Sequence, residues 1–187
     1  MDKLKTYFTS IGFDHSTSGK VAERFQQKTF NKGDYFVTEG KTTLQVGFVA
    51  DGQFQYYATT MQGEEKTTYI ALQNSFIASL LSYLTETPAR ENIRALTNAT
   101  LWTIDKKNVL NLQNEIPAFK NFYVQLLEWQ LCCIDKSRFD FITLPAEQRY
   151  EKLLKEEPAL LQQVPLQYLA SMLGITPRHL SRLRKKM

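Results

Sequence analysis

The chain has few of the residues that hold metal ions or form disulfides. Only two of its 187 residues are Cys and two are His. The cysteines, Cys132 and Cys133, are neighbours, and a bridge between them would be strained. Two thiols in a chain that lacks a secretory signal predict a reduced, cytoplasmic protein. We expect neither a metal site nor a cofactor.

Long apolar runs are also missing. No stretch approaches the roughly 18 apolar residues that a membrane-spanning helix needs. The first residues, MDKLKTYFTSIGFDHS, lack the apolar core of a secretory signal. We therefore expect no membrane partner. The hydrophobic fraction of 43% and the aromatic fraction of 12% are those of a globular protein with one large domain, or a medium and a small one.

Acidic residues are absent from the C-terminal end. Five Arg or Lys residues fall within the last ten positions, and residues 158–177 carry no charged side chain. Because the whole chain has a net charge of +4, this +5 leaves −1 for residues 1–157. The basic character of the protein therefore belongs to its C-terminal segment.

In the first half of the sequence, turn residues separate short segments with the spacing of antiparallel β structure. Strands are expected at Tyr35–Thr38, on both sides of Asp51-Gly52, at Lys66–Leu72, and on both sides of Asn98. Asp51-Gly52 is typical of a tight hairpin turn. Short strands at roughly 8–12 residue spacing indicate a sandwich or barrel. Two short helices are expected near residues 19–26 and 79–85.

From Asp105 the pattern becomes helical. Asp105 suits the N-cap of a first helix, and a long amphipathic helix follows from Pro117. Its apolar stripe steps by three and four residues and comprises Phe119, Phe122, Leu126, Trp129 and Cys133. The stripe belongs either to a core shared with the β domain or to a dimer interface with a second copy. We favour the dimer interface.

The last residues, VPLQYLASMLGITPRHLSRLRKKM, have the pattern of two helices around a sharp turn. Gly174 suits the left-handed C-terminus of the first helix. Thr176 and Pro177 suit the start of the second, whose Leu180 and Leu183 face inward. This spacing predicts a helix-turn-helix with a basic outer face, a motif that places its second helix in the DNA major groove. The alternative is an ordinary terminal helix with a solvated basic face.

The sequence resembles the Crp/Fnr superfamily of bacterial transcription regulators over nearly its whole length, in particular compact Bacteroidetes members. FNKGDYFVTEG, VGFVADGQFQYY and NSFIASLL resemble the cyclic-nucleotide-binding β roll. PAEQRYEKLLKEEPALLQQVPLQYLASMLGITPRHLSRLRKK resembles the DNA-binding end. The resemblance implies an α+β fold: an antiparallel β roll (a double-stranded β-helix) at 1–115, a dimerisation helix at 116–142, and a helix-turn-helix domain without a wing at 143–187.

The resemblance also implies a function and its residues. We expect a non-enzymatic, cytoplasmic, homodimeric regulator that binds a pseudo-palindromic operator in double-stranded DNA, with RNA polymerase as a further partner. Base-reading positions of the family fall on Pro177, Arg178, Ser181 and Arg182. Positions near the DNA backbone fall on Gln167, Thr176, His179, Lys185 and Lys186.

The ligand site departs from the family pattern. Members that bind cyclic nucleotides carry a Gly-Glu pair, whose Glu accepts from the ribose, and an Arg-Ser or Arg-Thr pair that grips the cyclic phosphate. This sequence has Ala78-Ser79 at the first place and Arg90-Glu91 at the second. We expect cyclic AMP not to bind, and an unknown small-molecule effector or none to act instead.

Four other readings are weaker. The tail also resembles AraC-type regulators, which can carry a β-barrel sensor, but these need two helix-turn-helix units and one is visible. A cupin-type ligand-binding or enzymatic β roll would hold a metal through several His residues. An iron–sulfur sensor needs about four thiolates, and a haem sensor needs an axial His. His15 and His179 lie far apart in the sequence, so they suit neither a cupin metal site nor the axial position of a haem.

Overall fold

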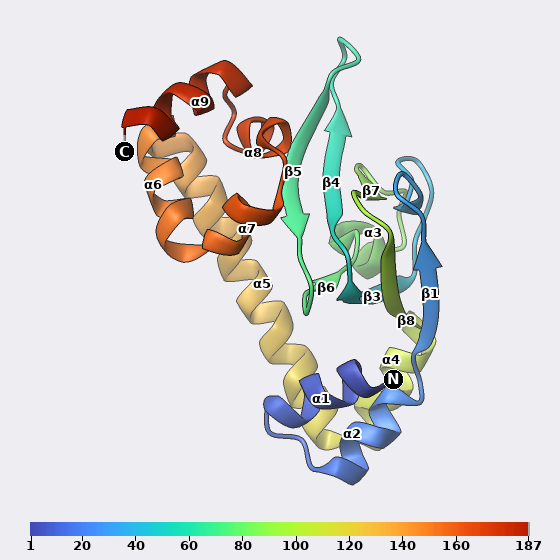
Figure 1. The fold of residues 1–187 in the computed structure, drawn as a ribbon. Coiled ribbons are helices and arrows are strands. Elements are labelled where there is room, and N and C mark those ends of the chain that lie inside the picture. The colour runs from blue at the N-terminus through green and yellow to red at the C-terminus, as the bar shows by residue number, and fades with distance from the viewer. Residues whose placement is uncertain (187) are drawn as a thin grey trace.

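The structure is a computed structural model that describes residues 1–186, except for the side chain of Lys186 (Figure 1). The strands are β1 Gln26–Phe30, β2 Tyr35–Val37, β3 Gln45–Asp51, β4 Phe54–Thr59, β5 Glu65–Ala71, β6 Phe76–Ile77, β7 Asn92–Ala95 and β8 Ala99–Asp105. The helices are α1 Asp2–Ser10, α2 His15–Ala22, α3 Leu80–Thr85, α4 Lys106–Glu115, α5 Pro117–Thr143, α6 Ala146–Glu156, α7 Pro158–Gln163, α8 Leu166–Met172 and α9 Pro177–Lys186. Among these helices, none is long and apolar enough to cross a membrane.

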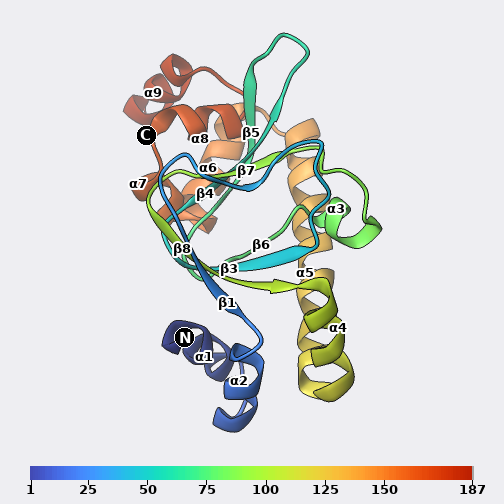
Figure 2. The ribbon, with the colours of Figure 1, turned by 90° about the vertical axis from the view of Figure 1, so that its right-hand side faces the viewer.

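The eight strands form two antiparallel sheets, with the orders β1-β8-β3-β6 and β2-β7-β4-β5. Apolar side chains from both sheets, among them Val49, Ile93 and Leu101, are fully buried in one cluster between them. Figure 2 views this arrangement from the side and shows α3, α4 and α5 on one flank of the strands. The predicted α+β fold with an antiparallel β roll is confirmed.

The turn at Asp51-Gly52 is present, but the predicted hairpin is wrong. Gly52 has φ +87°, and a Cβ there would lie 2.6 Å from the Cβ of Ala99. The chain reverses at this point, yet β3 pairs with β6 and β8, whereas β4 pairs with β5 and β7. The dipeptide therefore fixes a sharp change of direction and leaves the choice of partner strand to the packing of the two sheets.

Helices α1, α2 and α4 gather with the first turns of α5 at one end of the roll (Figure 1). Asp105 caps α4 as predicted, because its side chain accepts from the backbone N–H of Asn108 at 2.7 Å. The sequence prediction placed α2 about four residues too late and missed α1, β1, β6 and α7. These elements are short, and their apolar positions depend on distant parts of the chain.

The first part of the predicted dimer stripe lies in the chain's own core. Phe119 is only 3% exposed, and the ring of Phe122 lies 5.3 Å from that of Phe8 in α1. The assignment of Phe119 to a dimer interface is wrong for this reason, whereas Phe122 is half-buried and its assignment stays a prediction. The remaining residues of the stripe, Leu126, Trp129 and Cys133, are half-buried or exposed.

Helices α6 to α9 pack against the β roll through α8. Ile70 of β5 and Leu96 are buried in the same cluster as Leu169 and Leu180. β5 is an edge strand, and the Thr67 backbone N–H donates to the Ser171 hydroxyl at 2.9 Å. The predicted boundaries near 115 and 142 fall at the ends of α4 and α5, and the division into three domains stays a prediction.

Arg149 ties the end of α5 to the C-terminal helices. Its guanidinium donates to the backbone carbonyls of Phe141, Leu144 and Leu173 at 3.3, 2.6 and 2.7 Å. The same group lies over the Phe141 ring at 4.7 Å. That ring also lies 3.1 Å from where a Cβ of Gly174 would be. One side chain therefore joins the end of the long helix to the C-terminal end of α8, and no sequence motif indicated it.

Candidate functional site

The turn between α8 and α9 has the geometry that the sequence predicts. Gly174 has φ +69°, the Gly174 N–H donates to Ser171 O at 3.0 Å, and the Ile175 N–H donates to Ala170 O at 2.9 Å. These two bonds end α8 as a Schellman motif. The Thr176 hydroxyl then accepts from the His179 N–H at 3.2 Å and caps α9. The direction of α9 is thus fixed by local backbone chemistry.

The two faces of α9 differ sharply. Leu180 and Leu183 are 0% and 6% exposed and pack against α8 and its neighbours. The opposite face repeats at three- and four-residue spacing and consists of the exposed residues Arg178, Ser181, Arg182 and Lys185. Apart from the undescribed Lys186 side chain, α9 therefore presents three cations and a hydroxyl on one face, with no acid. We call these four residues the basic face.

The flanks of α9 are engaged with the protein itself. The His179 imidazole lies 3.3 Å from the Glu147 carboxylate of α6, and Arg184 donates to the Leu161 carbonyl at 3.3 Å. Because these groups hold α9 to α6 and α7, they orient the basic face more than they extend it. Arg184 contributes to the sequence charge but lies off the outward face.

The other predicted DNA-binding residues lie around the same helix. Thr176 and Pro177 are exposed at its N-terminus, and Gln167 is exposed in the first turn of α8. Lys186 belongs to α9, but its side chain lies outside the described residues. The structure therefore brings the described members of the predicted set to two adjacent helices.

A second apolar stripe on α5 faces away from the β roll. Val124, Leu131 and Ile134 are 44%, 67% and 46% exposed, and Leu127 is partly exposed. They follow three- and four-residue steps that continue to Arg138, which lies 3.3 Å from Asp135. Apolar residues at this heptad spacing are typical of a helix that packs on another helix. We call Val124, Leu127, Leu131 and Ile134 the outward stripe. It replaces Phe119 as the surface available to a partner.

The predicted ligand residues do not fit a cyclic nucleotide. The Ala78 N–H donates to the Tyr56 hydroxyl at 3.0 Å, so this amide is already used. The side chain of Ser79 is buried and lies beside Glu91, which stands where the resemblance puts the cyclic phosphate. Burial raises the pKa of the Glu91 carboxyl, and Ser79 opposes this shift. Arg90 is exposed and forms no ion pair among the described residues.

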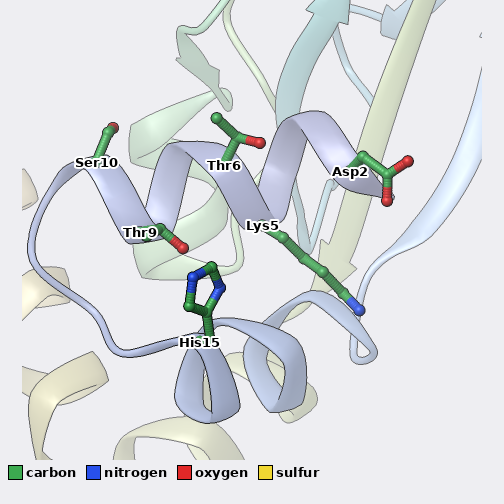
Figure 3. Close-up of a pocket in the computed structure, with 6 residues that line it drawn as sticks. All are labelled: Asp2, Lys5, Thr6, Thr9, Ser10 and His15. Atoms are coloured by element: carbon green, nitrogen blue, oxygen red, sulfur yellow. The ribbon is translucent and has the colours of Figure 1, made fainter.

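Two shallow hollows lie elsewhere on the surface. The first, of about 380 Å³, lies between α1 and α2 and is lined by Asp2, Lys5, Thr6, Thr9, Ser10 and His15. Figure 3 shows His15 pointing from α2 toward Thr9 of α1. The second, of about 340 Å³, has Lys32, Arg94 and Tyr168 in its wall. Within residues 1–186, no group of three His, Cys, Asp or Glu side chains could hold a metal ion.

Comparisons with known proteins agree with this architecture. Residues 27–115 match the family model of the cyclic nucleotide-binding domain. A CooA mutant from Carboxydothermus hydrogenoformans aligns with a TM-score of 0.70 and 21% identity over 89% of this chain and 78% of that chain. The Thermus thermophilus catabolite activator protein aligns at 0.62 and 19% over 94% and 84%. FixK2 from Bradyrhizobium japonicum aligns at 0.74 and 12% over 87% and 83%. No curated protein matches by sequence.

The fold therefore defines a class: a β roll joined by a long helix to a helical C-terminal unit. Residues 27–115 match the cyclic nucleotide-binding domain, and the whole chain shares its fold with the solved Crp/Fnr transcription regulators, as the resemblance predicted. These neighbours are regulators and not enzymes. The domain match favours this reading over the AraC-type and cupin-type alternatives.

Proposed function

We propose that the chain is a sequence-specific, homodimeric DNA-binding transcription regulator. The observation that carries this proposal is the basic face, which is exposed directly opposite two buried leucines. A helix held in this way can enter the major groove with Arg178 and Arg182 toward base edges, where Arg pairs bidentately with guanine. Lys185 and Thr176 lie toward the phosphates, which fix register and orientation.

A second copy of the chain completes the site. The outward stripe leaves apolar side chains on α5 that a partner helix would bury, and Crp/Fnr-type regulators act as dimers. Two α9 helices related by a two-fold axis would enter successive major grooves roughly 34 Å apart. The operator is then pseudo-palindromic, with half-sites about one helical turn apart. RNA polymerase is the expected partner of the DNA-bound dimer.

The effector of this regulator is unknown or absent. Ala78-Ser79 lacks the carboxylate that would accept from the ribose, and Glu91 puts a carboxyl group where the resemblance places the cyclic phosphate. A carboxylate at that position repels the negatively charged phosphate. Cyclic AMP is therefore not the expected ligand, and regulation requires either another small molecule or none.

Selection of duplexes from a random DNA library tests the proposal. We expect a two-fold symmetric motif whose binding weakens steeply with salt. Arg182→Ala should relax base preference at one position of each half-site, at a cost of about 1–3 kcal/mol in discrimination. Lys185→Ala should weaken binding to all sequences alike.

Arg24→Ala is the matched control for these variants. Arg24 is a surface cation that pairs with Glu115 at 2.8 Å, at the end of the molecule occupied by α2 and α4. Its loss removes the same charge from the protein but should leave the motif and the affinity unchanged. The assignment of α9 is overturned if Arg182→Ala and Arg24→Ala select the same motif with the same affinity.

A further inference from the structure

Helix α3 is held at both ends by side chains of the same protein. Before its first turn, the Tyr56 hydroxyl accepts from the Ala78 N–H at 3.0 Å and donates to the Ala78 carbonyl at 3.3 Å. In its last turn, the carbonyls of Tyr83 and Leu84 accept from the Lys106 ammonium at 2.9 and 3.2 Å. Tyr56 belongs to one sheet, whereas Ala78 directly follows β6 of the other. The two sheets are thus tied together beside α3.

The middle of α3 is tied to the long helix. Tyr83 is 2% exposed, and burial together with the neighbouring Tyr123 side chain of α5 raises the pKa of its hydroxyl. Tyr123 precedes Val124, the first residue of the outward stripe. A connected set of hydrogen bonds and packed side chains therefore runs from β4 through α3 to the helix on which dimerisation is proposed. A conformational change can pass along such a set of contacts only if at least one of the contacts can break and form again.

The contact between the Tyr56 hydroxyl and the backbone of Ala78, which we call the link at Ala78, is made by protein groups alone. We call the link closed when these hydrogen bonds are present and open when they are broken. The backbone amide there is a donor that a bound effector could otherwise use, and the Tyr56 hydroxyl satisfies it in a partly buried setting. An opened link would leave this amide without its protein partner, which is unfavourable for a donor shielded from water. Glu91 adds to the closure, because its carboxyl group lies beside Ser79, next to Ala78, and repels anions.

We propose that Tyr56 is an internal ligand of the β roll, which holds α3 against α5 in the arrangement that supports DNA binding without any bound cyclic nucleotide. The inference rests on the proposed DNA-binding function for one of its readouts. It goes further by naming the residue that takes the place of an effector. The protein then needs no cyclic nucleotide for activity, and regulation by this class of molecule is absent.

Tyr56→Phe tests the inference, since it removes the hydroxyl and keeps the ring. The affinity for a labelled duplex that carries the selected motif should fall about tenfold, as expected for the loss of two neutral hydrogen bonds from one of two states in equilibrium. Tyr35→Phe is the matched control. It removes a hydroxyl that bonds the Tyr57 hydroxyl at 2.9 Å elsewhere on the same sheet, and should leave DNA affinity unchanged.

Titration of the unaltered protein with cyclic AMP and cyclic GMP completes the test. Millimolar nucleotide should give no saturable heat of binding and no gain in DNA affinity. The inference is overturned if either nucleotide raises DNA affinity, or if Tyr56→Phe behaves like Tyr35→Phe. Should Tyr56→Phe fail to fold, hydrogen exchange at the Ala78 amide of the unaltered protein decides: slow exchange supports the closed link, and fast exchange contradicts it.

Failure of the proposed function has a different signature. If the unaltered protein selects no DNA motif, the proposed function fails. The amide exchange at Ala78 and the nucleotide titration still test the internal ligand in that case, because neither depends on DNA.

Discussion

The β roll and the C-terminal helices use their polar groups in opposite ways. In the roll, Arg94 lies over the Tyr57 ring at 4.6 Å, pairs with Glu65 at 2.7 Å, and bonds to Gln55 at 2.9 Å. On α9, Arg178 and Arg182 are exposed and have no such partners among the described residues. An arginine whose guanidinium is bonded within the protein stabilises the fold. An exposed arginine without such bonds is available to a ligand. This difference supports the proposal that α9 is the DNA-binding element.

The largest expected effect concerns the outward stripe. Leu131→Asp places a charge in the centre of the apolar surface that a second copy would bury, and should cost roughly 3–6 kcal/mol of dimerisation free energy for the two copies. Analytical ultracentrifugation should then find monomers where the unaltered chain forms dimers. Cys132→Asp, one residue further and exposed off the stripe, is the control and should leave the dimer intact. A dimer that tolerates Leu131→Asp would show that α5 uses another face.

Arg149 breaks the comparison, because it is an inward arginine of the helical part that donates three hydrogen bonds, although its buried Nε has no partner among the described residues. Arg149→Met keeps the length of the side chain but leaves three carbonyls without their donor, which should lower the free energy of unfolding by about 2–4 kcal/mol. Urea unfolding measures this loss. Arg178→Met, on the basic face, is the matched control and should change stability little. If both substitutions lowered the free energy of unfolding equally, the distinction between arginines bonded within the protein and arginines exposed on α9 would be wrong.

The smallest effect concerns Glu91, a polar group that the roll accommodates poorly. Burial raises the pKa of its carboxyl above the ordinary value of 4.5. Its contribution to stability is therefore present below that value and is lost as pH rises through the raised pKa. Glu91→Gln should raise the thermal midpoint by a few degrees at pH 7 and not at pH 4, as followed by calorimetry.

Glu64→Gln should behave in the opposite sense. A hydrogen bond from Lys66 lowers the pKa of the fully exposed Glu64 carboxyl, so any stability it contributes is present at pH 7 and is lost as pH falls. A thermal midpoint of Glu91→Gln that rises equally at both pH values would contradict the burial of its charge.

Local sequence signals were sufficient for the C-terminal unit and insufficient for the roll. The Gly174 turn, the Thr176 cap and the inward leucines all came from residues within about ten positions of each other, and the structure has each of them. The Asp51-Gly52 dipeptide was equally local, but the pairing of β3 and β4 depends on strands whose residues lie up to sixty positions away in the sequence.

The apolar pattern of α5 shows the same limit. The spacing of Phe119, Phe122 and Leu126 predicted an amphipathic helix correctly, but a helix with two apolar stripes does not reveal which one its own domain covers. The packing of α1 against the first turns of α5 decides this, since Phe8 contacts both Phe119 and Phe122. The outward stripe could be identified only after that contact was known.

The sequence by itself determined the fold class, the long helix, the helix-turn-helix and the mismatch at the ligand site, because caps, turns and residue types act over short distances. Only the tertiary structure decided which stripe of α5 is exposed, that Arg149 joins α5 to the C-terminal helices, and that Tyr56 bonds to the backbone of Ala78. These three features depend on contacts between segments that are remote in the chain or on backbone carbonyls, which carry no residue-specific signal. Their physical basis is burial, which forces each enclosed polar group to find a partner wherever the fold provides one.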